Sequence, residues 1–266
     1  MTELEQAAIE LKQAPAILVL AANGFSISEG LNLFATDGAI RDEFADFARH
    51  YGLPSLLAAM QYPYSDPESY WAFWSRFIDV YHTGYQPGAM MKNLFRLLSD
   101  KDFFILTTNG EGHFEKAGFP AERILEIEGD FFTVSPHGDS SQRLPLDSEQ
   151  IHKIAAQKKL RVSEADLPRN EQGEILFVNA GQPEKTALAR LQNWLKIHRK
   201  QAVVVLELGV GQRNPMIRVP VLQLMQQCPA WKLIVVNQGQ IEIPPALKER
   251  SLALYGDLSA VLSALN

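Results

Sequence analysis

The sequence predicts an α/β fold: a doubly wound, parallel, Rossmann-like sheet with a smaller inserted domain. Two observations support this prediction. At least five short apolar runs each end in small or polar residues, and most of them precede a helical pattern. The interval between the first two runs is too long for one crossover helix, which predicts inserted substructure.

The first apolar run, residues 17–20, follows a predicted helix over 3–13 that ends before Pro15. Its lack of polar residues is typical of a strand covered on both faces. Ala21-Ala22-Asn23-Gly24 then allows a close approach of the backbone. Open α/β folds bind nucleotides at such turns, but an ordinary strand-to-helix turn has the same composition.

The next part of the chain, 36–99, is predicted to be rich in helices. An aromatic stripe over 70–81 follows a helix start at Asp66-Pro67, and acidic neighbours favour packing in a core over stacking on nucleic-acid bases. A helix is expected over 90–98. The following strands are expected at 103–107 and 124–127, each ending in polar or glycine-containing residues.

Residues 131–185 contain many turn residues, short strand-like pieces and a candidate helix over 148–159. The remaining predicted elements are helices at 184–198, 219–226 and 258–265 and strands at 202–208, 231–236 and 251–255. We therefore expect a Rossmann-like domain formed by 1–35, 95–130 and 186–266. The small inserted domain is expected to comprise 36–94 and 131–185.

Composition limits the function classes. A net charge of −6 argues against a nucleic-acid binder that depends on a basic surface. The acidic N-terminal segment is not typical of a signal peptide, and no apolar run approaches the roughly 20 residues of a membrane span, so we expect a cytoplasmic protein. The single cysteine, Cys228, is expected to be a buried structural thiol.

Several strand ends carry short motifs in a defined order. They are Ala22-Asn23-Gly24-Phe25-Ser26 with Gly30 and Leu33-Phe34-Ala35, Thr107-Thr108-Asn109-Gly110-Glu111, Glu126-Ile127-Glu128-Gly129, Gly209 with Gly211, Asn237, and Gly256-Asp257. With these motifs in this order, the chain resembles the sirtuins across nearly its whole length, and most closely the class M sirtuins, which are linked to macrodomain proteins. By this resemblance, the domain of 1–35, 95–130 and 186–266 would be the NAD-binding one.

The resemblance implies NAD as cofactor and transfer of ADP-ribose to an acceptor protein, in particular one that carries a lipoyl group. It implies catalytic roles for Asn109, Glu111 and Glu128. The cofactor-binding residues that it implies are Ala22, Asn23, Gly24, Ser26, Gly30, Phe34, Asn109, Gly209, Gly211, Asn237, Gly256 and Asp257.

Chemistry supports these catalytic candidates. Cleavage of the NAD glycosidic bond develops an oxocarbenium-like centre, which a nearby carboxylate stabilises. Asn109 can hydrogen-bond the ribose or the amide, and Glu111 can supply an acceptor to the nicotinamide site. Glu128 can act as general base or as electrostatic stabiliser, although a solvated acid at a strand end has the same sequence.

The sequence also departs from the sirtuin pattern. Glu128 stands where the family has histidine and class M members have glutamine, and Glu111 replaces aspartate. Ala22 replaces the first glycine of the opening turn, where Asn23 is expected to crowd the pyrophosphate. The opening arginine is Ala35, and the four zinc cysteines are absent, so 131–185 is expected to be a remnant of the zinc module without metal.

Two other functions therefore remain open. One is a catalytically degenerate sensor of NAD or ADP-ribose, or a scaffold protein. The other, an NAD-dependent deacylase, is less favoured because the histidine base is missing.

Other polar residues outside these motifs are expected to have lesser roles. His113 is expected to be exposed or to cap a helix, and His137 is expected to lie in a surface turn. The region 131–185 contains only one pair of histidines, His137 and His152, so a zinc site is not expected there. His198 is expected to be a charge at a helix C-terminus. Arg213 and Asn214 suit either phosphate contacts or a solvated loop.

Overall fold

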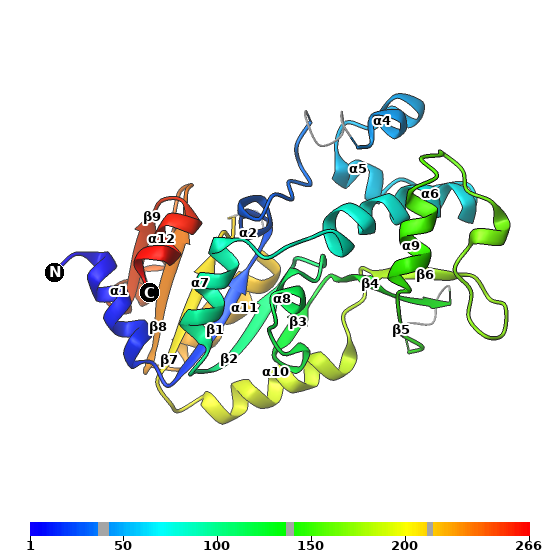
Figure 1. The fold of residues 1–266 in the computed structure, drawn as a ribbon. Coiled ribbons are helices and arrows are strands. Elements are labelled where there is room, and N and C mark those ends of the chain that lie inside the picture. The colour runs from blue at the N-terminus through cyan, green and yellow to red at the C-terminus, as the bar shows by residue number, and fades with distance from the viewer. Residues whose placement is uncertain (37–42, 137–140, 212–214) are drawn as a thin grey trace.

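The computed structural model describes residues 1–36, 43–136, 141–211 and 215–266. A six-stranded parallel sheet in the order β3-β2-β1-β7-β8-β9 forms its centre (Figure 1). Strand order reverses between β1 and β7, which confirms the predicted doubly wound α/β fold. The strands are β1 (Ala16–Ala21), β2 (Asp102–Thr107), β3 (Ile124–Glu126), β7 (Val203–Leu208), β8 (Trp231–Asn237) and β9 (Ser251–Tyr255).

Helices cover both faces of this sheet. This agrees with the sequence of the central strand β1, which is apolar at every position and can therefore be buried on both sides. Ile17 and Val19 of β1 pack in one hydrophobic cluster, and Leu18 and Leu20 pack in another on the opposite face. The first cluster includes α1 (Glu3–Gln13), α7 (Ala89–Leu98), α8 (His113–Lys116) and α12 (Leu258–Ala264). The second includes α10 (Lys185–His198) and α11 (Pro215–Gln226).

A second, smaller body stands beside the sheet (Figure 1), and we call residues 44–83 and 129–180 the small lobe. It holds a three-stranded sheet of order β5-β4-β6 and several helices. Its elements are α4 (Ala45–Tyr51), α5 (Leu56–Met60), α6 (Pro67–Ile78), a π-helical turn (Asp79–Thr83), β4 (Gly129–Pro136), β5 (Leu144–Pro145), α9 (Ser148–Ala155) and β6 (Leu176–Ala180).

The two insertions of the chain share one core in the small lobe. Phe47 and Phe73 from the first insertion belong to the same hydrophobic cluster as Val134 and Ile151 from the second. The indole N–H of Trp71 donates a hydrogen bond of 2.9 Å to the carbonyl oxygen of Leu176. The buried aromatic stripe of α6 is thus packing core, as the sequence predicts.

Some element boundaries differ from the prediction. The helix over 148–159 ends at Ala155, because Lys158 has a left-handed backbone with φ +48°. The helix expected from residue 219 begins at Pro215 and accommodates Pro220 in its interior. The described chain is completed by α2 (Asn23–Ser28) and short 3₁₀ turns at Ala121–Arg123, Glu164–Asp166 and Pro245–Arg250.

His198 lies at the C-terminus of α10, as the sequence predicts, but its side chain has partners beyond that helix. It is buried at the end of α10, where Nε2 lies 3.1 Å from Asp102 Oδ2 and Nδ1 lies 2.9 Å from Gln201 Oε1. Tertiary structure explains the burial of His198, because the first residue of β2, Asp102, lies against the end of α10. Cys228 is buried, as expected.

The described helices were also compared with the length of a bilayer crossing. Over residues 1–36, 43–136, 141–211 and 215–266, no helix is both long and apolar enough to span a membrane.

Candidate functional site

A cavity of about 1200 Å³ lies at the carboxyl ends of the parallel strands and extends to the small lobe. Turns after β1, β2, β3, β7 and β8 form one wall of it, as expected for an open α/β sheet. The opposite wall is largely apolar and includes Leu57, Met60 and Trp74 from the small lobe, together with Phe131 of β4. A ligand here would contact both bodies of the molecule.

Most of the predicted site residues line this cavity. They are Ala22, Asn23, Gly24, Phe34, Asn109, Glu111, Glu128, Gly209, Gly211 and Asn237. Ser26 is buried behind the wall, where its hydroxyl donates to Glu111.

The other predicted cofactor residues do not line the cavity. Gly30 follows α2 in a left-handed turn, with φ +95°. Gly256 precedes α12, and the Asp257 carboxylate caps that helix by accepting from Ala260 N–H at 3.0 Å. His137, Arg213 and Asn214 lie outside the described residues.

The first turn is fixed by contact between two strand ends. Gly24 N–H donates to the carbonyl oxygen of Gly209 at 3.0 Å, and a Cβ on Gly24 would lie only 2.6 Å from that oxygen. Glycine at position 24 therefore allows the turns after β1 and β7 to touch. Phe25 N–H donates to Ala22 O at 2.7 Å, so two amides at the start of α2 already have protein partners.

Asn109 is buried and held in a defined orientation. Its backbone N–H donates to Thr107 Oγ1 at 3.0 Å, and its side-chain Nδ2 donates to Ala22 O at 3.1 Å. Oδ1 is buried and has no hydrogen-bond partner among the described residues. Because an unpaired buried acceptor is costly, this oxygen is available for a ligand donor in the cavity.

Glu111 is a buried acid in the wall of the same cavity. The Ser26 hydroxyl donates a short hydrogen bond to its Oε1. Burial raises the pKa of Glu111 to about 7, against an ordinary value of 4.5. The carboxyl can therefore exist in either protonation state near neutral pH.

His113 is placed differently from the prediction of an exposed or capping residue. It begins α8, but it is buried beneath Tyr85, whose ring stacks on it at a centroid distance of 3.6 Å. Its Nδ1 lies 3.6 Å from Glu111 Oε1. The sequence did not indicate that His113 belongs to the site, because its stacking partner Tyr85 comes from a distant segment. The one available signal was its position two residues after Glu111.

Glu128 is exposed at the end of the short strand β3. Partial desolvation raises its pKa above the ordinary value. Its backbone carbonyl accepts a hydrogen bond of 2.5 Å from Gly181 N–H. The carboxylate thus reaches the cavity from its solvent side, whereas Glu111 reaches it from the interior.

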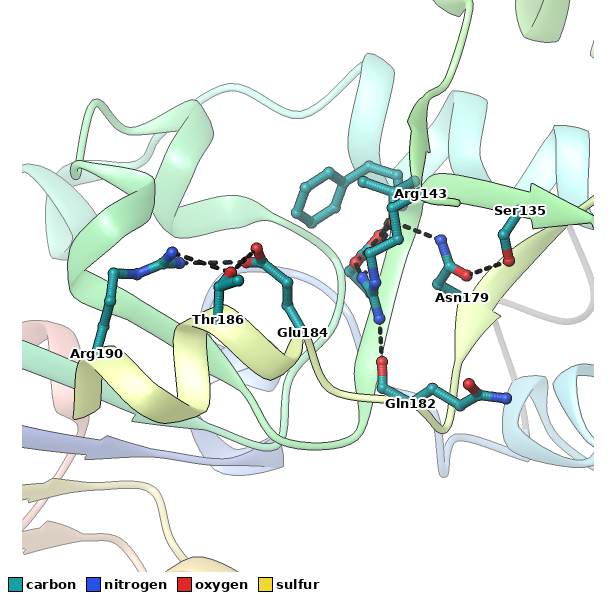
Figure 2. Close-up of polar contacts among 10 residues, drawn as sticks. Ser135, Arg143, Asn179, Gln182, Glu184, Thr186 and Arg190 are labelled. Atoms are coloured by element: carbon teal, nitrogen blue, oxygen red, sulfur yellow. Dashed lines mark hydrogen bonds and ion pairs between the residues drawn. The ribbon is translucent and has the colours of Figure 1, made fainter. Parts of the chain in front are cut away.

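A polar network holds the end of β6 and the residues after it (Figure 2), where Ala180 and Gly181 line the cavity. The Arg143 guanidinium pairs with the Asp130 carboxylate and donates to the carbonyl oxygen of Gln182. Asn179 donates from Nδ2 to Thr133 Oγ1 at 2.8 Å and accepts from Ser135 at 2.7 Å. No sequence pattern indicates this network, because Asn179 and Gln182 lie far along the chain from their partners Ser135 and Arg143.

Further acids lie behind Glu111. The pKa values of Glu115 and Glu126 are raised, first by burial and then by repulsion from Asp130 and Glu111. A search of the described residues found no group of three or more histidine, cysteine or acidic side chains with the arrangement of a metal site.

The fold and cavity define an α/β protein with a ligand site at the topological switch point of its parallel sheet. A solved structure from work on the mechanism and regulation of Sir2 enzymes matches it with a TM-score of 0.62 and 17% identity. The match covers 99% of this chain and 96% of that chain. The chain therefore has the fold of Sir2 enzymes.

Curated relatives agree with this fold. A protein ADP-ribosyltransferase of Staphylococcus aureus (strain Mu50 / ATCC 700699) is 24% identical, over 95% of this chain and 84% of that protein. A probable bifunctional ADP-ribose hydrolase/ADP-ribosyltransferase of Fusarium oxysporum f. sp. cubense is 25% identical over 96% of this chain, which spans only 46% of its length. No family model matches the chain. The chain is thus similar to proteins named for transfer of ADP-ribose and has the fold of Sir2 enzymes.

Proposed function

We propose that the chain is an NAD-dependent protein ADP-ribosyltransferase of the sirtuin type, most similar to class M members and located in the cytoplasm. The acceptor in this proposal is a protein that carries a lipoyl group. The observation that carries the proposal is Asn109 Oδ1, a buried acceptor without a described partner, beside Glu111 in a cavity at the switch point. The names of the curated relatives are consistent with transfer of ADP-ribose.

Each residue has a distinct role in the proposed reaction. NAD supplies a glycosidic bond whose cleavage places positive charge on the ribose ring. Asn109 orients the reacting end by accepting a hydrogen bond at Oδ1, and Glu111 as a carboxylate stabilises the developing charge. Glu128, on the solvent side, takes the proton of the acceptor nucleophile. The apolar wall of the small lobe excludes water.

A second candidate is a protein without catalysis, either a sensor or a scaffold, and the first turn favours the scaffold. Helix N-termini bind phosphates through free amides. Here, the amides of Gly24 and Phe25 are already bonded to Gly209 O and Ala22 O. Fewer donors therefore remain for a pyrophosphate than a free helix start would offer.

Calorimetry and an assay of nicotinamide release distinguish the two candidates. We expect NAD to bind, and nicotinamide to be released when a lipoylated carrier protein is present. Binding of NAD or ADP-ribose without any release of nicotinamide would support the sensor instead. Absence of binding at millimolar NAD would rule out the transferase and an NAD sensor, and would leave an ADP-ribose sensor or a scaffold.

Asn109→Ala tests the reacting end of the site. We expect nicotinamide release to fall by about 100-fold, because the ribose loses its positioning acceptor. Asn193→Ala is the matched control, since Asn193 is exposed on α10, outside the cavity lining. Unchanged turnover in Asn109→Ala would contradict the positioning role.

A further inference from the structure

Glu111 and His113 form a buried pair whose second member has no role in the reaction described above. Both side chains are almost fully buried, with 4% and 3% of their surfaces exposed. Nδ1 of His113 lies 3.6 Å from Glu111 Oε1, just beyond a hydrogen bond. Such contacts often tighten when a ligand binds.

The surroundings of the imidazole determine which nitrogen carries its proton. Nε2 lies 2.6 Å from the carbonyl oxygen of Tyr81, which can only accept, so Nε2 must be the donor. In the neutral ring, the Nδ1 lone pair then faces Glu111 Oε1, and Nδ1 has no partner within hydrogen-bond distance in the described chain. A lone pair and a carboxylate repel each other unless one of them carries a proton.

Stacking prevents the ring from escaping this contact. The Tyr85 ring lies parallel to the imidazole, with an angle of 8° between planes, and its hydroxyl donates to the Glu29 carboxylate. The charged and titratable groups around the pair are Glu29 beside α2, His82 of the π-helical turn and Tyr85 after it, Glu115 and Lys116 of α8, Glu126 of β3, and Asp130 of β4.

Burial decides where the proton resides in the free protein. Desolvation raises the pKa of Glu111 to about 7 and lowers that of His113 to about 4, so below pH 7 the carboxyl holds the proton while the imidazole stays neutral. The proposed reaction, however, requires Glu111 as a carboxylate.

We propose that His113 is a positioning residue that receives the Glu111 proton when a cationic ring occupies the cavity. The O–H bond at Glu111 Oε1 breaks and an N–H bond forms at His113 Nδ1. Nε2–H keeps its hydrogen bond to Tyr81 O, and no proton leaves the protein. Only the identity of the cation, the oxidised nicotinamide ring of NAD, rests on the proposed function.

The first test uses the free protein and needs no variant. Nitrogen NMR of ¹⁵N-histidine-labelled protein should show His113 as a neutral ring protonated at Nε2 between pH 6 and about 8. A ring protonated at Nδ1, or an imidazolium at pH 7, would overturn the proposal. This measurement decides the proton arrangement even if NAD does not bind, in which case only the proposed function fails.

The second test counts protons by calorimetry of NAD binding at pH 6 in two buffers of different ionisation enthalpy. We expect the wild-type protein to release close to no protons. His113→Leu should release about one proton per NAD and bind about tenfold more weakly at pH 6 than at pH 8. Tyr85→Phe, which retains the stacked ring, should match the wild type. Proton release by the wild type, or none by His113→Leu, would contradict the proposal.

Discussion

The two candidate acids show how strongly the environment changes one residue type. Glu111 and Glu128 have the same side chain, and the sequence placed both at strand ends near a reacting centre. In the structure, Glu111 is buried against Ser26, whereas Glu128 is exposed. Burial raises the pKa of Glu111 to about 7, and the partial desolvation of Glu128 raises its pKa in the same direction.

Glu111→Gln should change the pH dependence of stability. The folded pKa of about 7 exceeds the ordinary value of 4.5, so the folded protein binds the extra proton between these values. Wild-type stability should therefore fall as pH rises from 4.5 to 7, relative to the variant, and the difference should reach about 3 kcal/mol. Urea unfolding at pH 5 and pH 8 measures it; equal differences at the two pH values would contradict the raised pKa.

At the scale of elements, glycines at strand ends allow backbones to meet. Gly24 contacts Gly209, and Gly129 turns the chain from the sheet into β4 with φ +77°. The sequence marked these positions as small or turn residues. The sequence could not show that these glycines pack against other backbone segments and not against a ligand. That outcome depends on how turns far apart in the chain come together in the fold.

Gly129→Ala tests this junction. A Cβ at position 129 would lie 2.1 Å from the carbonyl oxygen of Asn179, so we expect the free energy of unfolding to fall by about 3 kcal/mol. Gly173→Ala is the control, since Gly173 has a similar φ of +82° but no atom within 4 Å of the added Cβ. It should cost only about 1 kcal/mol. Thermal or urea unfolding measures the loss of stability in each variant. Similar losses in both would show that the positive φ angle alone causes them, without a contribution from the contact with Asn179.

At the scale of the whole molecule, the cavity joins two bodies with separate cores. The sheet contributes polar turns, and the small lobe contributes Leu57, Met60 and Trp74. The domain boundaries near 36, 94, 131 and 185 stay a prediction, although both insertions share one hydrophobic cluster.

Hydrogen exchange with NAD should reveal this arrangement. Because both walls would contact one ligand, amides in 22–25 and 209–211 and amides in 57–61 should become protected together. At an NAD concentration of about 100 times Kd, local unfolding events that abolish NAD binding should become about 100-fold rarer. Amide exchange that depends on such events should slow by the same factor in the sheet turns and in the small lobe. Segment 185–198 of α10 serves as an internal reference outside the cavity lining. Protection confined to the sheet turns would show that the small lobe does not contact the ligand.

The sequence by itself determined the parallel sheet, the helices that cover it and the motifs that follow its strands. This was possible because burial on both faces leaves continuous apolar runs, such as that of β1, and because strand ends of a parallel sheet meet at one edge. It also suggested Asn109, Glu111 and Glu128 as neighbours of one cavity.

Only the tertiary structure decided the protonation partners and the packing around the site. His113 meets Tyr81 and Tyr85 across a long stretch of chain, and Arg143 meets Gln182 in the same way. Sequence spacing carries no information about such contacts. Desolvation depends on everything that packs around a group, and it sets the pKa of Glu111. For this reason, the fold was readable from the chain, while the chemistry of its acids was not.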